Sequence, residues 1–326
     1  MVRLPRELKR SQPNRTRRPD PVHVFAIIVN WNGGQENLEC LTSLEREGFA
    51  PDEIVFVDNG SRDGSVDLVM KQHPGLRFVL NANNEGFGEG SNAGAKEALD
   101  AGAEALFFVN NDVVLEPGCM ALLKAELDTG AGMTGPRVLF KEEPNRIWAA
   151  GGALTWRQNV STLVGNGELD SEAHGASREV DYVPGCALLI TRAAFEACEG
   201  FDARYFAYME DVDLGLRGKA LGARSTLCGE ARVLHGASKA TGGGYSARRK
   251  YMNGLNSVHF LRRHGDVGKW LRFAAFDVAT LPPLFLVELL RGNGRAVLAK
   301  GLGILHGLQG RRVRAEQLET DASRLW

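Results

Sequence analysis

The sequence predicts a doubly wound α/β sheet, and three observations lead to this fold class. Short continuous apolar runs alternate with segments whose apolar residues recur at helical spacing. Four such alternations fall within about ninety residues, as in a mostly parallel sheet flanked by helices. The apolar runs also end in polar residues, which places a candidate binding face along one edge of the sheet.

The elements follow from these patterns in chain order. Strands are expected at residues 24–31, 53–59, 76–80 and 105–109, because continuous apolar runs are typical of strands buried on both faces. Helices are expected around residues 38–44, from 61–65 onward and around 93–99. Residues 147–170 resemble a mixed region of strands and loops, and further strands are expected at 180–190 and 231–238.

Polar residues stand at the carboxyl ends of the predicted strands, where open α/β sheets bind ligands. They are Asn30, Asp58, Asn59, Asn81 and the run Asn110, Asn111 and Asp112. Any one of them would be an ordinary turn residue. As a set they favour a binding face in this half of the chain.

A Gly-rich segment at residues 83–94 precedes the third predicted helix. Gly86, Gly88 and Gly90 are expected to let the backbone approach a ligand, and the helix that follows offers free amides to a diphosphate. The spacing is neither G-x-G-x-x-G nor that of a P-loop, which argues against a dinucleotide oxidoreductase and a P-loop NTPase.

An acidic stretch at residues 205–217 carries the strongest candidate for acid–base chemistry. Glu210 and Asp211 are expected where a loop enters a helix, next to aromatic and apolar residues. Desolvation raises the pKa of a carboxylate in such surroundings and suits it to act as a general base. The alternative is a helix cap with solvated acids.

Two further residues are candidate metal ligands. Asp112 with its neighbouring amide oxygens suits Mg²⁺ or Mn²⁺ shared with substrate phosphates, although a lone acid at a strand end is often a turn residue. His235 ends a predicted strand on the same face and is a second candidate, against the alternative of a structural histidine. Residues 241–245 are expected to form a mobile loop that orders over substrate.

The composition excludes several other classes. The chain has 326 residues, 44% hydrophobic and 24% charged, with a net charge of -1 that argues against nucleic-acid binding. Its five scattered cysteines fit core positions in a reducing cytosol. Residues 1–20 hold seven Lys/Arg and no apolar core, so residues 1–21 are expected to be a disordered basic tail without a signal peptide, or one attracted to an anionic membrane.

The C-terminal residues 246–326 are expected to form two or three amphipathic helices rich in Lys/Arg, Trp and Phe. Residues 270–290 are strongly apolar, but Asp277, Pro282, Pro283 and Glu288 interrupt them, so a spanning helix is not expected. The helices could lie in a membrane interface, pack on the catalytic domain, or support a homodimer.

Several segments, in order, resemble the inverting glycosyltransferases of family 2, in their bacterial rhamnosyltransferase-like branch. They are residues 29–33, 57–65, 84–94, 110–112 at the family's metal-binding D-x-D position, and 200–214. The resemblance implies a GT-A catalytic domain at residues 22–245. Its nucleotide-binding half would cover residues 22–115 and its acceptor half residues 116–245.

The resemblance also implies residue roles. Asp58 would bind the pyrimidine or its ribose, Asp112 and His235 would hold the cation, and Asp211, beside Glu210, would deprotonate the acceptor hydroxyl. The other implied nucleotide-sugar residues are Asn30, Asn32, Asn59, Asn84, Gly86, Phe87, Asn92 and Asn111. One departure is that Asn110 replaces the first Asp of D-x-D, which leaves fewer charged metal ligands.

The implied activity is inverting transfer of L-rhamnose from dTDP-rhamnose to a lipid-linked or polysaccharide acceptor in cell-envelope glycan synthesis. The enzyme would be cytoplasmic and peripheral on the inner face of the plasma membrane. UDP-galactofuranose and other UDP-hexoses are alternative donors. A nucleotidyltransferase is disfavoured because residues 32–36 lack the arginine of its loop, and a non-catalytic carbohydrate-binding or scaffold module is disfavoured by the acids and the histidine named above.

Overall fold

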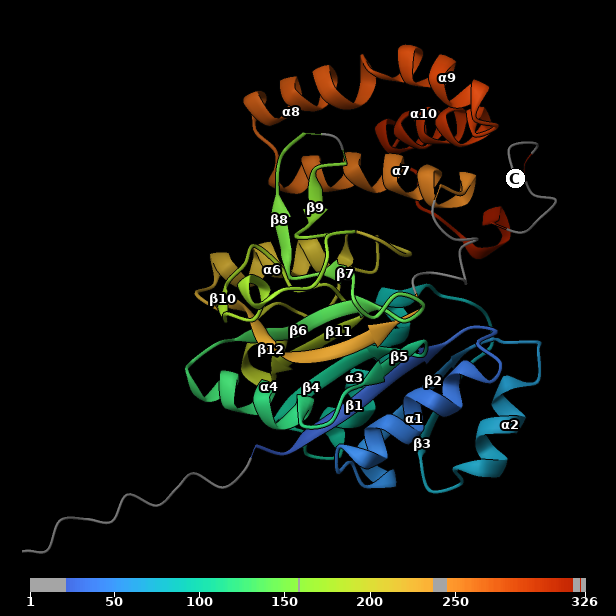
Figure 1. Ribbon diagram of the computed structural model, residues 1–326. Coiled ribbons are helices and arrows are strands. Elements are labelled where there is room, and N and C mark those ends of the chain that lie inside the picture. The colour runs from blue at the N-terminus through green and yellow to red at the C-terminus, as the bar shows by residue number, and fades with distance from the viewer. Residues whose placement is uncertain (1–21, 158, 237–244, 319–322, 324–326) are drawn as a thin grey trace, which may run out of the picture.

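The computed structural model describes residues 22–157, 159–236, 245–318 and 323 (Figure 1). Its strands are β1 (Val24–Asn30), β2 (Ile54–Asn59), β3 (Arg77–Asn81), β4 (Ala105–Asn110), β5 (Val113–Leu115), β6 (Met133–Phe140), β7 (Ile147–Ala149), β8 (Gly152–Leu154), β9 (Ser161–Leu163), β10 (Arg178–Glu179), β11 (Ala187–Thr191) and β12 (Ser225–His235). Its helices are α1 (Glu36–Arg46), η1 (Pro51–Glu53), α2 (Ser65–Gln72), α3 (Phe87–Asp100), α4 (Cys119–Asp128), η2 (Glu172–His174), α5 (Arg192–Ala197), α6 (Glu210–Ala220), α7 (Ala247–His264), α8 (Val267–Phe273), η4 (Ala274–Val278), α9 (Leu281–Leu290), α10 (Gly294–Leu308) and η5 (Ala315–Leu318). The predicted tail at 1–21 and residues 241–244 of the predicted substrate loop lie outside the described residues.

The main sheet has the strand order β10-β12-β6-β11-β4-β1-β2-β3, with β5 beside β12 and β7 beside β6. The run β4-β1-β2-β3 is parallel, which confirms the predicted doubly wound class. Beyond β4 the sheet is mixed, because β11 runs antiparallel between β4 and β6 while β6 and β12 are parallel. The first half of the chain therefore places the ends of four parallel strands along one edge.

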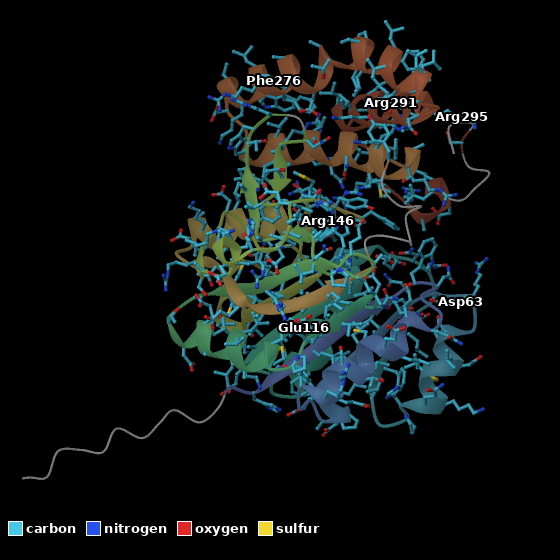
Figure 2. All side chains as sticks on the ribbon, viewed as in Figure 1. Asp63, Glu116, Arg146, Phe276, Arg291 and Arg295 are labelled. Atoms are coloured by element: carbon cyan, nitrogen blue, oxygen red, sulfur yellow. The ribbon has the colours of Figure 1, made fainter. Side chains whose placement is uncertain are left out.

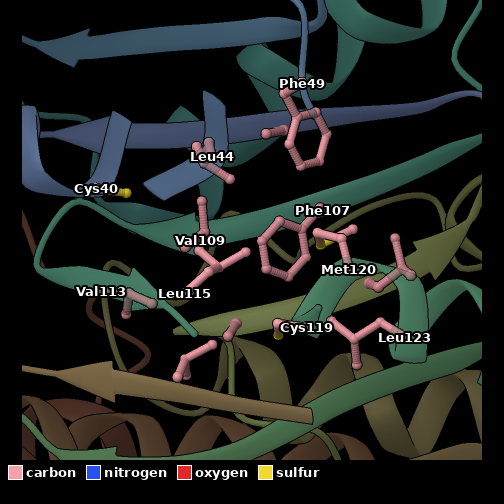
Figure 3. Close-up of a cluster of buried hydrophobic side chains, with 14 of the residues drawn as sticks. Cys40, Leu44, Phe49, Phe107, Val109, Val113, Leu115, Cys119, Met120 and Leu123 are labelled. Carbon is pink, nitrogen blue, oxygen red and sulfur yellow. The ribbon is translucent and has the colours of Figure 1, made fainter. Parts of the chain in front are cut away.

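The apolar run of β1 divides between two cores, one on each face of the sheet. Ala26 and Ile28 join the cluster under α1 and α4, whereas Phe25 and Ile27 join the cluster under α3 and α5. Figure 3 shows part of the first cluster, in which Phe107 of β4 lies between the loop after α1 and helix α4. All five cysteines are buried and free, as predicted for core residues.

The Gly-rich segment is partly helical rather than a loop throughout. Helix α3 begins at Phe87, so Gly88 and Gly90 lie in its first turns and are buried. Gly86 precedes the helix with φ of 88°, and a Cβ there would lie 2.3 Å from the carbonyl oxygen of Phe206. The glycine therefore allows a close approach within the protein, between the start of α3 and the loop before α6.

Two predicted strands have different bounds in the structure. The strand expected at 180–190 begins only at Ala187, because Pro184 has no amide hydrogen and the Gly185 amide donates to Asp211 Oδ2 at 2.9 Å instead of to a neighbouring strand. The strand expected at 231–238 begins already at Ser225, and a bulge between Cys228 and Arg232 interrupts the pattern that would have revealed its first half.

The C-terminal helices form a separate layer over the acceptor half, at the end of the molecule away from α1 and α2 (Figure 1). Helices α7 and α10 cross closely, since a Cβ at Gly254 would lie 2.3 Å from the carbonyl oxygen of Lys300 and one at Gly303 would lie 2.1 Å from that of Tyr251. The hairpin β8–β9 rises to this layer. The predicted packing on the catalytic domain is therefore present.

The stretch Val267–Leu290 corrects the prediction that polar residues and prolines interrupt the apolar run. It is helical over 24 residues and, by length and composition alone, long and apolar enough to cross a membrane. The chain passes Asp277 in a π-helical turn, and the two prolines occupy the first turn of α9, where they cost no backbone hydrogen bond.

Candidate active site

A cavity of about 560 Å³ lies between the strand ends of the nucleotide half, the hairpin β8–β9, the start of α6 and helix α7. Predicted site residues in its lining are Asn59, Asn84, Gly86, Phe87, Asn111, Glu210, Asp211 and His235. Among the described residues, Asn30, Asn32, Asp58, Asn92 and Asp112 do not line it. The structure therefore brings together the acidic pair, the histidine and part of the predicted nucleotide edge.

Glu210 and Asp211 are the first two residues of α6, as predicted, and both face the cavity. Asp211 Oδ2 accepts a hydrogen bond from the Gly185 amide at 2.9 Å, and Oδ1 accepts one from the Val212 amide at 2.8 Å. Glu210 is buried, and its Oε2 has no hydrogen-bond partner among the described residues. The alternative of two solvated cap residues is therefore excluded.

The surroundings of Glu210 and Asp211 stabilise a negative charge to different extents. Burial raises the pKa of Glu210 well above its ordinary value, and the neighbouring charge of Asp211 adds to this effect. Burial also raises the pKa of Asp211, but its two backbone donors oppose the rise. Burial therefore favours the protonated form more strongly at Glu210 than at Asp211, whose backbone donors stabilise the carboxylate.

The turn that leads into the acidic pair is strained. Tyr208 and Met209 have φ of 71° and 75°, in the left-handed region that non-glycine residues seldom adopt. Asn256, fully buried on α7, donates from Nδ2 to the carbonyl oxygens of Ala207 and Tyr208, both at 2.8 Å. Helix α7 thus fixes the backbone from which Asp211 is presented to the cavity.

The start of α3 fixes the same turn from the other side. The Phe87 amide donates to the carbonyl oxygen of Phe206 at 2.7 Å, and the Phe87 ring lies edge-on to Phe201 with centroids 6.0 Å apart. The predicted role of Gly86 and Phe87 at the cavity therefore combines with a structural one, which is to dock the nucleotide half against the acidic segment.

Asp112 and His235 meet although they lie far apart in the sequence. The His235 Nε2 atom is 3.3 Å from Asp112 Oδ1, and the Gly236 amide donates to the Asp112 carbonyl oxygen at 3.1 Å. Trp148 lies edge-on to the imidazole, with ring centroids 4.5 Å apart. Both side chains are buried, and His235 reaches the cavity wall.

This pair fits one edge of a divalent cation site. Two donors bonded to one octahedral ion at about 2.1 Å lie about 3.0 Å apart, close to the observed separation of Nε2 and Oδ1. A carboxylate and an imidazole suit Mn²⁺, and Mg²⁺ would rely more on Asp112. No group of three or more His, Cys, Asp or Glu with metal-site spacing occurs in the described part of the chain, so a bound ion would need oxygen ligands from substrate or water.

Asn30 and Asp58 form a buried network at the ends of β1 and β2. The Asn30 Nδ2 atom donates to Asp58 Oδ1 at 2.8 Å and to Ser65 Oγ at 2.9 Å, and the Ser61 amide donates to Asp58 Oδ2 at 2.9 Å. Asn32 joins this edge by accepting from the Arg62 amide at 2.8 Å. These residues shape the loops that follow β1 and β2.

Four predicted amides have equally specific placements. Asn59 donates to the Gly86 carbonyl oxygen at 2.9 Å, and Asn84 Oδ1 accepts from the Gly86 amide at 2.9 Å. Asn111 donates to Asn30 Oδ1 at 3.2 Å from the cavity wall. Asn92 lies away from the cavity and exchanges two hydrogen bonds with the Phe201 backbone, so its structural role is to join α3 to the segment before α6.

Several cavity residues were not assigned to the site from the sequence. Arg248 and Arg249 line the wall formed by α7, and the Arg249 guanidinium lies 5.3 Å from the centre of the Tyr208 ring. Both arginines belong to the Lys/Arg-rich C-terminal region, for which the sequence predicts a membrane or packing role. Asn159 and Tyr182 also line the cavity, and Asn256 lies behind it, but no local sequence pattern marks any of these three.

The sequence profile of glycosyl transferase family 2 matches residues 25–194. The chain is 31% identical over 238 residues to an N-acetylglucosaminyl-diphospho-decaprenol L-rhamnosyltransferase of Mycobacterium tuberculosis, covering 66% of this chain and 76% of that protein. It is 27% identical to a galactofuranosyltransferase of the same organism, covering 65% of this chain and 69% of that one.

A likeness in fold extends to a solved structure. The mannosyltransferase of Pyrobaculum calidifontis, in complex with GDP-Man and Mn²⁺, superposes with a TM-score of 0.53 over 90% of this chain and 89% of that one. The sequence identity is 14%, so the likeness concerns the fold alone. It supports the GT-A architecture predicted for the chain.

Proposed function

Since the chain belongs to glycosyl transferase family 2 and is a glycosyltransferase, we propose that it transfers L-rhamnose from dTDP-rhamnose with inversion at the anomeric carbon. The proposed acceptor is a lipid-linked or polysaccharide glycan of the cell envelope. The similarity to the mycobacterial L-rhamnosyltransferase supports this choice of sugar and of a lipid-linked acceptor. The observation that carries the chemistry is the Asp211 carboxylate at the cavity, held by two backbone amides beside the buried Glu210.

In the proposed mechanism Asp211 accepts the proton of the acceptor hydroxyl as that oxygen attacks the anomeric carbon of the donor. The Gly185 and Val212 amides keep the Asp211 carboxylate oriented toward the cavity. The raised pKa of Glu210 favours its protonated form, which does not compete for the same proton. Inversion by direct displacement requires no protein nucleophile, which agrees with the burial of every cysteine.

The donor is proposed to bind at the nucleotide edge, with its base and ribose near the loops shaped by Asn30, Asn32 and Asp58. Asn59, Asn84 and Asn111 would face the sugar or the diphosphate, since these amides lie on the cavity wall. Asp112 and His235 would hold Mg²⁺ or Mn²⁺ there. When bound, the cation would offset the negative charge that develops on the departing diphosphate.

The acceptor is proposed to enter between the hairpin β8–β9 and helix α7. Arg248 and Arg249 place positive charge on that wall, which suits a diphosphate such as that of a polyprenyl-diphosphate-linked glycan. The similarity to a galactofuranosyltransferase supports a second candidate, transfer of galactofuranose from its UDP donor, on the same cavity and with the same base.

Calorimetric titration of the purified protein with dTDP, UDP and GDP, each with Mn²⁺ and with EDTA, tests the donor assignment. Tighter binding of dTDP with Mn²⁺ is the expected result. Preference for UDP would replace rhamnose by galactofuranose or another hexose. Absence of binding by all three nucleotides would contradict the transferase assignment of this cavity. Analysis of the anomeric configuration of the product then tests inversion.

A further inference from the structure

The helical stretch Val267–Leu290 buries acidic side chains and exposes large apolar ones, which is the reverse of a surface helix in water. The buried residues in α8, η4 and α9 are Phe273, Asp277 and Glu288, so both carboxylates of η4 and α9 point inward. Eight large apolar side chains of the stretch face outward and are between 42% and 91% exposed. They are Val267, Leu271, Phe276, Val278, Leu286, Val287, Leu289 and Leu290.

The inward carboxylates are fixed by partners in the fold. Asp277 Oδ1 accepts from Lys300 Nζ at 2.5 Å and from the Asn159 amide at 3.1 Å, which joins the stretch to α10 and to the hairpin β8–β9. Glu288 accepts from Asn293 Nδ2 and Arg291, both at 2.9 Å. A transbilayer orientation would require the bonds of Asp277 to Lys300 and Asn159 to break and would leave Lys300 without its buried counter-ion.

Positive charge accompanies the apolar face. Arg272, Arg291 and Arg295 are exposed on or directly after the stretch. Figure 2 shows Arg291 and Arg295 in the same outer helical layer as Phe276, on the end of the molecule remote from Asp63 and Glu116. Exposed aliphatic side chains next to arginines match the chemistry of an anionic lipid surface, with an apolar interior beneath negatively charged head groups.

We propose that Val267–Leu290 docks the protein on an anionic membrane by lying in the plane of the interface, with its leucines in the acyl region and its arginines at the head groups. The helix does not cross the bilayer, because Asp277 and Glu288 remain bonded to the protein. In this orientation the nucleotide half points away from the lipid. The docking surface is independent of the sugar that the enzyme transfers.

Vesicle flotation of the full chain tests the apolar part of this surface. Wild-type protein is expected to float with vesicles of phosphatidylcholine and phosphatidylglycerol. The double variant Leu286→Glu/Leu290→Glu should partition at least about tenfold more weakly, because each leucine leaves the acyl region. The matched control is Leu169→Glu/Leu221→Glu, which changes leucines that are 60% and 59% exposed elsewhere on the protein and should float like wild type.

The charged part has its own test. Arg272→Gln/Arg295→Gln should weaken partitioning onto phosphatidylglycerol vesicles by about 25-fold, since each basic residue contributes about fivefold near an anionic surface. Binding to pure phosphatidylcholine should be weak and unchanged by these substitutions. Equal binding to both kinds of vesicle would overturn the anionic preference.

Three other results would overturn the proposal as a whole. The first is wild-type protein that does not float, or a Leu286→Glu/Leu290→Glu variant that floats as well as wild type. The second is protein that stays in the membrane through alkaline carbonate extraction, which would indicate a spanning helix. The third is a vesicle-free dimer that the leucine variant converts to a monomer, which would make this face an interface between two copies. Nucleotide titration of the same variants shows that they are folded and keeps this test separate from that of the donor.

Discussion

Substitution of Asn256 should show that helix α7 positions the proposed base. The side chain is fully buried and donates to two successive carbonyl oxygens, those of Ala207 and Tyr208. These carbonyls belong to the turn in which Tyr208 and Met209 take left-handed backbone angles, directly before Glu210. Asn256→Ala removes both donors.

The expected loss of stability follows from these contacts. Each lost hydrogen bond costs about 0.5–1.5 kcal/mol, so the two together cost about 1–3 kcal/mol. Each left-handed residue stores about 1–3 kcal/mol of strain, and part of it is released if the turn relaxes. The free energy of unfolding should therefore fall by about 1–3 kcal/mol. Ser257→Ala, which removes a neighbouring buried hydroxyl without a hydrogen-bond partner among the described residues, is the matched control and should change it little.

Urea unfolding and steady-state kinetics measure the two consequences separately. If Asn256 positions the turn, kcat should fall at least tenfold in Asn256→Ala while KM for the donor stays near the wild-type value, because the nucleotide edge is untouched. Asn256→Asp should be no better, since a carboxylate cannot donate to the two carbonyls. An unfolding free energy within about 0.5 kcal/mol of wild type, or an unchanged kcat in a folded variant, would refute the assigned role.

Four further predictions concern the acids of the site and of the helical layer. Asp211→Asn should lower turnover by orders of magnitude with donor binding intact, whereas Glu210→Gln, which imitates the protonated form, should lower it less than tenfold; the reverse order in a transfer assay would exchange their roles. Turnover should fall as the pH falls through the raised pKa of Asp211, since the base must be ionised. The unfolding free energy should fall as the pH rises above 4.5 toward the raised pKa of Glu210, because in this range the folded state holds a proton that the unfolded state has lost. Asp112→Ala should weaken nucleotide binding in Mn²⁺ but not in EDTA, and equal weakening in both would count against cation binding. Lys300→Met should lower the free energy of unfolding by about 3–5 kcal/mol, because it leaves the buried Asp277 carboxylate without its counter-ion. A decrease of less than about 1 kcal/mol in denaturant unfolding would contradict a buried ion pair.

The nucleotide half could be predicted from the sequence because its signals are local. Each parallel strand there is one uninterrupted apolar run, so β1, β2 and β4 emerged within one residue of their bounds. The start of α3 could not be predicted in the same way, because glycines disfavour a helix by intrinsic propensity. Gly90 is nevertheless helical, because tertiary packing overrides the local preference. A Cβ at this position would lie 2.9 Å from Asn59 Nδ2, so the packing also requires a residue without a side chain.

The site was predicted where one short segment carries both the chemistry and its placement. Glu210 and Asp211 are adjacent and open a helix, and the acid-rich first turn is visible in the sequence. Asn256 carries no such signal, because its importance depends on two carbonyls about fifty residues earlier in the chain. Asn30 and Asp58 show another limit of sequence-based prediction. They stand at strand ends as predicted, but they hydrogen-bond to each other and shape the neighbouring loops without lining the cavity.

The family match and the functional unit have different boundaries in this chain. The profile ends at residue 194, before Asp211, His235 and helix α7. The proposed base, one proposed metal ligand and the wall that carries Arg248 therefore all come from later residues.

Helix α7 in turn depends on α10, because the close crossing at Gly254 and Gly303 leaves no room for another side chain between them. Removing residues 265–326 would strip the apolar docking face and also expose α7, so loss of activity and loss of membrane binding would occur together. Point substitutions on the outward face of α9 separate loss of membrane binding from loss of activity, because the outward leucines of α9 do not support the turn before Asp211.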